Sequence, residues 1–108
     1  MELKPVKTSE ATAISSGSVD LAIAAYLADA ATGDVTALFN LGVAYSTGSG
    51  GVDCDLVEAH KWFNLAASRG HEEAGWCRAD VSDEMTAREI AEAQRRARRW
   101  LAEERRAA

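Results

Sequence analysis

Proline, cysteine and long apolar runs are all scarce in this sequence. One proline and two cysteines occur in 108 residues. Two cysteines without a recognisable pattern cannot build the disulfide framework of a small secreted domain, so we expect reduced thiols. No apolar stretch approaches the roughly 20 residues that a membrane-spanning helix needs, and the first residues lack the apolar segment of a secretory signal. These absences favour a cytoplasmic protein without a membrane span.

The composition that remains favours helices. Hydrophobic residues make up 47% of the chain and charged residues 27%, with a mean hydropathy of −0.20. Much of the hydrophobic fraction is alanine and β-branched runs are few, which indicates closely packed helices rather than a sheet. At this length we expect one all-α domain with a modest core.

The net charge of −5 conceals two regions of opposite sign. Residues 1–85 carry 5 basic and 13 acidic side chains, whereas residues 86–108 carry 7 arginines and 4 glutamates. The acidic body argues against a nucleic-acid-binding protein as a whole. The basic segment leaves a narrower version of that hypothesis open.

Residues 37–45 have the pattern of an amphipathic helix. Its apolar positions recur at a spacing of four and are Ala37, Leu41 and Tyr45. Asp34 is the predicted N-cap, and Gly48 marks the end. Gly42 lies in mid-helix, where glycine costs about 1 kcal/mol relative to alanine. We therefore expect a neighbouring helix to cross there too closely for any side chain.

A second helix is predicted after the glycine-rich turn at residues 48–51. Asp55 and Glu58 are spaced as in a capping box, and Gly70 marks the end. Its apolar positions lie three or four apart and are Ala59, Trp62, Phe63, Ala66 and Ala67. The turn follows no predicted strand and lacks the Gly-Lys-Ser/Thr ending of a phosphate-binding loop, so we interpret it as a simple connection.

The second helix has partial copies on both sides. Four residues each lie 37 positions before a residue of the same type or character: Ala22, Tyr26, Ala30 and Gly33 precede Ala59, Phe63, Ala67 and Gly70. Ala97, Trp100 and Leu101 repeat the spacing of Ala59, Trp62 and Phe63 at an offset of 38. Periods in this range are typical of two-helix solenoid repeats.

These residues resemble the Sel-one-like repeat, a branch of the tetratricopeptide-type solenoids. The resemblance is carried by Ala37-x-x-Asn40-Leu41-Gly42-x-x-Tyr45-x-x-Gly48, Asp55, Ala59-x-Lys61-Trp62-Phe63 and Ala66-Ala67-x-x-Gly70. The chain departs from the pattern by the extra Gly51 before Val52, and residues 71–85 lack the Leu-Gly-x-x-Tyr core. The resemblance implies an adaptor or regulatory protein without catalytic residues or a cofactor.

The predicted fold is therefore a short all-α solenoid of about two and a half repeats. Residues 1–17 are expected to form a mobile arm, and the repeat domain covers residues 18–106. Within it we expect a half repeat at 18–33, a full repeat at 34–70 and a degenerate terminal repeat with a capping helix at 71–106.

Two flanking helices complete this prediction. Ser18 is expected to cap a helix that reaches about Thr32, with an inner face of Leu21, Ala22, Ala25, Tyr26 and Ala30. Thr86 and Glu89 form a full capping box at the start of the last helix. That helix carries the apolar stripe Ile90, Ala93, Ala97, Trp100 and Leu101. In residues 71–84, either Trp76 or Cys77 is expected to face inward beside Ala74 and Val81.

The partner-binding surface is predicted by analogy with tetratricopeptide-type solenoids, where the first helix of each hairpin lines the concave side. That analogy selects Asn40, Val43, Thr47, Glu73 and Trp76. The expected ligand is another protein or peptide. The small number of repeats also leaves exposed stack ends, which predicts self-association.

The arginine-rich segment supports the alternative hypothesis. The cluster consists of four arginines in the five positions 95–99, together with Arg105 and Arg106. The four arginines at 95–99 surround a helix and cannot all form ion pairs. Through Arg95, Arg98 and Arg99 they could meet an acidic protein, a nucleic-acid backbone or an anionic membrane surface. Basic charge near a helix C-terminus is also favoured by the helix dipole alone, so a solvated helix end competes with this hypothesis.

The remaining chemistry-bearing residues predict neither a metal site nor catalysis. Cys54, His60, His71 and Cys77 leave 5, 10 and 5 residues between them, whereas structural zinc sites need closer pairs. No residue pattern orients a histidine beside a nucleophile. The aromatic residues recur at repeat-equivalent positions and are predicted to be core, with Trp76 as the one to watch.

Overall fold

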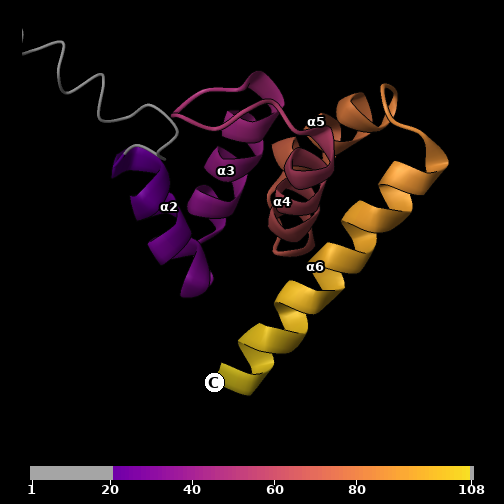
Figure 1. Ribbon diagram of the computed structural model, residues 1–108. Coiled ribbons are helices and arrows are strands. Elements are labelled where there is room, and N and C mark those ends of the chain that lie inside the picture. The colour runs from indigo at the N-terminus through magenta and orange to yellow at the C-terminus, as the bar shows by residue number, and fades with distance from the viewer. Residues whose placement is uncertain (1–20, 108) are drawn as a thin grey trace, which may run out of the picture.

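The computed structural model describes residues 21–107, and these form a stack of helices. The elements are α2 (Leu21–Ala31), α3 (Val35–Thr47), α4 (Leu56–Ser68), α5 (Glu72–Ser82) and α6 (Ala87–Ala107). In Figure 1, α2 and α3 lie side by side, α4 and α5 follow, and α6 crosses diagonally past α4. The predicted all-α solenoid is confirmed. The predicted arm at 1–17 and the cap at Ser18 lie outside the described residues.

The α3–α4 hairpin begins and ends at the predicted residues. Asp34 accepts a hydrogen bond from the Ala37 backbone N–H at 3.1 Å, and Gly48 closes α3 in the left-handed conformation with φ of 74°. Asp55 accepts from the Glu58 N–H at 3.1 Å, which is one half of the expected capping box. The other half is absent, because the Asp55 N–H instead donates to the Tyr45 carbonyl at 2.9 Å. That bond ties the glycine-rich turn back to α3.

The crossing of α3 and α4 explains Gly42. A Cβ built on Gly42 would lie 2.5 Å from Cδ1 of Phe63, closer than carbon atoms approach without a shift. Phe63 is 2% exposed and Trp62 is equally buried, so α4 contributes the largest rings of the core. The lack of a side chain at Gly42 thus makes room for the ring of Phe63 where α3 and α4 cross.

The first described helix is rotated from its prediction. Leu21 is 88% exposed, and Ala22 and Ala25 are also exposed, so their predicted place on the inner face is wrong. Ala30 is buried and Tyr26 is partly buried, as predicted, and Ile23, at 1% exposed, joins them in place of the other three. A branched side chain fills the space beside α3 better than alanine does, and this sets the rotation of α2.

Helix α5 is capped by a histidine. Nδ1 of His71 accepts a hydrogen bond from the Ala74 N–H at 3.1 Å. Ala74 and Val81 are buried and Cys77 is partly buried, whereas Trp76 is exposed, so Cys77 is the residue that faces inward. Arg78 donates to Oδ1 of Asn64 at 2.6 Å and joins α5 to α4.

Helix α6 packs against α4. Thr86 and Glu89 form the full predicted capping box, with bonds of 2.8 and 3.1 Å. Ala93 and Ala97 are buried, and Trp100 meets Trp62 edge-on at 4.9 Å between ring centroids. Arg69 and Glu104 form an ion pair between the end of α4 and the end of α6. Among residues 21–107, no helix is both long and apolar enough to cross a bilayer.

Candidate functional site

The side of α3 that carries Asn40, Val43 and Thr47 has no charged residue. Val43 is 36% exposed and Asn40 is half-buried on the same side. Oγ1 of Thr47 donates to the Val43 carbonyl at 2.9 Å and lies 3.0 Å from Oγ of Ser49, so this hydroxyl is engaged locally. Val43 and Asn40 therefore remain the more available of the three predicted residues on this helix.

An aromatic contact joins this side of α3 to the start of α5. The rings of Phe39 and His71 stack with centroids 4.3 Å apart and an interplanar angle of 12°. Phe39 also contacts Phe63 at 5.7 Å. Because His71 caps α5, this stack places the N-terminus of α5 beside α3. Sequence reasoning assigned Phe39 to the core and left His71 without a role, so it missed this connection.

The exposed face of α5 is acidic and has a tryptophan at its centre. Trp76 is 65% exposed and Glu73 is exposed beside it. At about 100° per residue, three further exposed acids fall within roughly 40° of Trp76 around the helix axis: Glu72, Asp80 and Asp83. We refer to Glu72, Glu73, Trp76, Asp80 and Asp83 as the Trp76 face. Sequence reasoning named only two of these residues, although helical spacing around Trp76 would have found the rest.

The exposure of Trp76 has a counterpart in the preceding repeat. Trp76 lies 37 positions after Phe39, so the two residues occupy equivalent places in α5 and α3. The ring of Phe39 is covered by His71, the N-cap of α5. Among the described residues nothing equivalent covers Trp76, which is why a large ring stands in solvent.

The arginines of α6 fall into two groups. Arg95 pairs with Glu92, and Arg96 bonds both Glu92 at 2.8 Å and Glu58 at 2.6 Å. Arg98 and Arg99 are exposed, and neither forms an ion pair within residues 21–107. The structure places all of them on a helix that packs against α4, away from the predicted residues on α3.

The solvent face of α6 carries more arginines than were predicted. Arg88, Arg95, Arg99 and Arg106 lie 7, 4 and 7 positions apart, which brings them into line along the helix. We call these four residues the arginine stripe. Arg106 belongs to the basic cluster noted in the sequence, whereas Arg88 was missed because it precedes that cluster, although the helical spacing includes it.

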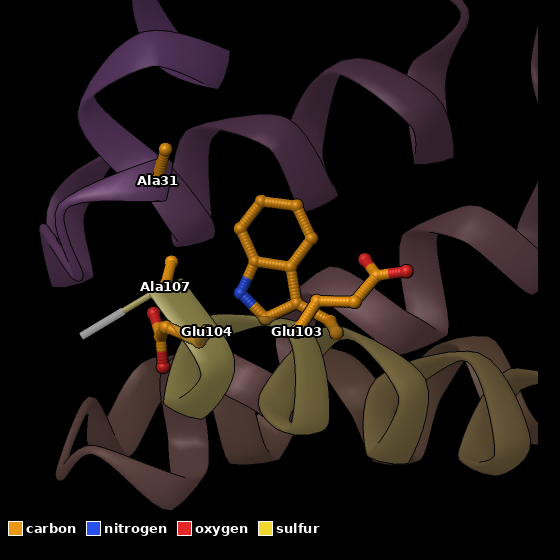
Figure 2. A pocket seen from close by; sticks show the side chains of 5 residues that line it. Ala31, Glu103, Glu104 and Ala107 are labelled. Carbon is orange, nitrogen blue, oxygen red and sulfur yellow. The ribbon is translucent and has the colours of Figure 1, made fainter.

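A small hollow lies between the ends of α2 and α6. It has a volume of about 160 Å³ and is lined by Ala31, Trp100, Glu103, Glu104 and Ala107. Figure 2 shows Ala31 on the α2 side, with Glu103, Glu104 and Ala107 on the α6 side. Nε1 of Trp100 is buried and has no hydrogen-bond partner among the residues that the structure describes. This hollow offers one ring and two carboxylates.

The three described groups with shifted pKa values lie apart from that hollow. Burial and the nearby Arg78 lower the pKa of His60, whose buried Nδ1 has no hydrogen-bond partner within residues 21–107. Burial, then Glu58 and Asp55, raise the pKa of Tyr45. Burial, then Glu73 and Asp80, raise the pKa of Cys77.

Two of the four residues considered for zinc, His71 and Cys54, form hydrogen bonds within the fold. His71 caps α5, and Sγ of Cys54 donates to the Ser46 carbonyl at 3.5 Å. Within residues 21–107, no three metal-ligating side chains gather at one place.

Residues 35–71 match the family model of the Sel1 repeat. The match covers α3, α4 and His71, which is the hairpin with the confirmed caps and the Gly42–Phe63 contact. No curated protein and no solved structure matches the chain significantly. Sel1 repeats generally mediate protein–protein interaction.

Proposed function

We propose that this chain, a Sel1-like repeat protein through its residues 35–71, is a non-catalytic adaptor that binds another protein. The proposed surface consists of Asn40, Val43 and Thr47 on α3 with Glu73 and Trp76 on α5. A cytoplasmic location belongs to the same proposal and agrees with the free thiols of Cys54 and Cys77.

The observation that carries this proposal is where the exposed apolar side chains stand. Four large hydrophobic residues of the described chain are exposed, and two of them, Val43 and Trp76, lie on α3 and α5. The Phe39–His71 stack joins α3 to the N-terminus of α5. Exposed apolar side chains surrounded by polar ones are typical of protein-binding surfaces.

The mechanism is that of a preformed surface. Val43 and Trp76 stand on capped helices that pack on a common core, so a partner meets side chains whose backbone is already fixed. Little conformational entropy is then lost on binding. Because few repeats build the surface, we expect an affinity for a peptide of about micromolar or weaker.

An affinity capture with matched variants tests this function. The immobilised chain is exposed to lysate from its source cell, as wild type, as Asn40→Ala/Val43→Glu and as Leu27→Glu. Leu27 on α2 is 36% exposed, the same as Val43, so it controls for a charge placed on an exposed apolar site. We expect bound proteins to be lost with the α3 variant and kept with Leu27→Glu. Equal capture by all three chains would remove α3 from the proposal.

The second candidate function uses the arginines of α6. Arg98 and Arg99 are exposed without an ion pair in the described chain, which favours an anionic ligand such as nucleic acid or an anionic membrane surface. Phosphate binding weakens steeply as salt rises, whereas binding through the uncharged residues Asn40 and Val43 of α3 does not. Titration of duplex DNA and anionic vesicles at low and high salt distinguishes the two functions.

A further inference from the structure

The Trp76 face is charged and exposed. Within residues 21–107 none of its four carboxylates takes part in an ion pair. Two of these carboxylates, Glu73 and Asp80, lie close enough to Cys77 to add to the effect of burial in raising the pKa of its thiol. The nearest base on α5, Arg78, is held by Asn64. A ligand for this face must therefore combine positive charge with an affinity for an exposed indole.

Arginine has both properties. Its guanidinium stacks on aromatic faces and pairs with carboxylates through a planar set of donors. A row of arginines matched in length to the Trp76 face would satisfy the carboxylates and cover the ring together. Lysine would supply the charge but stacks less well on an indole.

The same chain carries such a row. The arginine stripe lies opposite the buried face of α6, which contains Ala93 and Ala97. At about 1.5 Å per residue the stripe is roughly 27 Å long, and the Trp76 face is roughly 16 Å long. Only Arg95 of the four has an ion-pair partner in the described chain. The acidic face therefore fits within the length of the basic one.

The two faces do not satisfy each other within one chain. Every described ion pair of α6 is made within α6 or with α4, and none reaches α5. The contact between α5 and α6 is also slight, because α6 packs against α4. Two complementary surfaces are thus left open on one molecule.

We propose that the Trp76 face of one copy of this chain docks on the arginine stripe of a second copy. The proposal rests on the proposed role as a protein-binding module and names one of its partners. Arg99 or Arg95 of the second copy stacks over Trp76, and the neighbouring arginines pair with the carboxylates around it. In this contact the second copy covers Trp76, just as His71 covers the equivalent Phe39 in the preceding repeat.

This contact is heterologous, because two different surfaces meet. Each added copy leaves one free Trp76 face and one free arginine stripe. Association therefore continues beyond a dimer unless the rotation between copies closes a ring. Since both surfaces are exposed and charged, the association is also sensitive to salt.

Light scattering on the wild-type chain gives the first test. We expect the mean mass to rise with concentration at low salt and to fall when concentrated salt is added. Trp76→Ala should weaken the association at least about tenfold, as a central aromatic residue does in other interfaces. A wild-type chain that remains monomeric at low salt up to concentrations on the order of millimolar overturns the proposal.

A charge exchange between two variants gives the decisive test. Arg88→Glu/Arg99→Glu removes the basic surface, and Glu73→Lys/Asp80→Lys removes the acidic one. We expect each variant alone to be monomeric and their equimolar mixture to associate, because one still carries the native acidic face and the other the native basic stripe. Arg98→Glu/Arg105→Glu makes the same change in charge about 90° around α6 and should leave association largely intact.

The results also separate this inference from the proposed function. Asn40→Ala/Val43→Glu should self-associate like the wild type, because α3 takes no part in the contact. A chain that captures a partner through α3 but shows no association of the mixed variants refutes the inference and leaves the proposed function in place. Binding of an oligo-arginine peptide at Trp76 by a strictly monomeric chain assigns the face to another basic protein and overturns the second copy as its occupant.

Discussion

Helices α3 and α5 stand 37 positions apart and occupy equivalent places, yet they are built differently. At the two positions where α3 buries Leu38 and Leu41, α5 has Gly75 and Arg78. Where α3 has Gly42 beneath the Phe63 ring, α5 has Ala79, which is exposed. Helix α3 is thus packed on both sides, and α5 on one.

The difference shows what a solenoid repeat requires of its neighbours. Two leucines and a glycine let α4 cross α3 closely enough to bury Phe63. Without them α5 offers no such crossing, and α6 packs against α4 instead. The Trp76 face of α5 is exposed and charged, at other positions than these three. Loss of the interior pattern at residues 75, 78 and 79 and the charged residues around Trp76 are therefore two separate differences between α5 and α3.

Among the changes that test this comparison, Phe63→Ala should have the largest effect on stability. Removing a ring that is 2% exposed leaves a cavity against Gly42 and should lower the free energy of unfolding by about 3–5 kcal/mol. A small domain has little more than this in total, so we expect loss of the cooperative thermal transition. Circular dichroism during heating measures it. Trp76→Ala is the control at an exposed ring and should change stability by no more than about 0.5 kcal/mol.

The two mid-helix glycines should respond to alanine in opposite directions. Gly42→Ala drives a methyl group into the Phe63 ring and should destabilise by about 1–2 kcal/mol, since overpacking outweighs the gain in helix propensity. Gly75→Ala meets only Cβ of Ala67 at 4.0 Å and should stabilise by about 0.5–1 kcal/mol. Urea denaturation of the pair gives the comparison. If both variants lose stability, the close crossing at Gly42 is not what distinguishes α3 from α5.

The sequence predicted the hairpin well because its signals are local. Asp34, Gly48 and the box at Thr86 and Glu89 act within one helical turn, and their caps are confirmed. Gly42 was interpretable because glycine in a helix interior needs a steric reason. The inner face of α2 was predicted wrongly because the repeat offset favoured Ala22 over Ile23. Which side of a helix is buried depends on the volume of its neighbours, and the offset contains no information on volume.

The candidate site was predicted less completely for a related reason. Trp76 and Glu73 were named by analogy with a concave surface, and whether a partner contacts them remains a prediction. The other acids of the Trp76 face and the outer arginines Arg88 and Arg106 follow from helical spacing, but only once the exposed side of each helix is known. The pairing of Arg96 with Glu58, across 38 positions, depends on the docking of α6 against α4. No local pattern specifies that contact.

Acid should destabilise the fold through His60, which is buried and lies near Arg78 of α5. Burial and then Arg78, which stands where α3 has Leu41, lower the pKa of His60 in the folded chain. As pH falls, the unfolded chain therefore binds this proton first, and stability declines from about pH 6.5 downward until the lowered pKa is passed. Urea denaturation between pH 7.5 and 5.5 measures the decline. Arg78→Met should reduce it and His60→Leu should abolish this component; an unchanged decline in both would exclude His60 as its source.

The smallest expected effect concerns the thiol of Cys77, which reports the negative potential of α5. Burial raises its pKa, and Glu73 and Asp80 raise it further, so less of the reactive thiolate is present than at an ordinary cysteine. In a Cys54→Ser background, alkylation of Cys77 by iodoacetamide at pH 8 should therefore be slow. Glu73→Gln/Asp80→Asn should accelerate it roughly twofold, because removing two nearby carboxylates lowers the pKa of the thiol. The exchange Glu89→Gln, on α6, changes one charge away from Cys77 and should leave the rate unaltered. If the α5 variant reacts no faster than this control, the acids of the Trp76 face are too well solvated to change the pKa of Cys77. The difference between α5 and the uncharged side of α3 would then be one of packing and not of electrostatic potential.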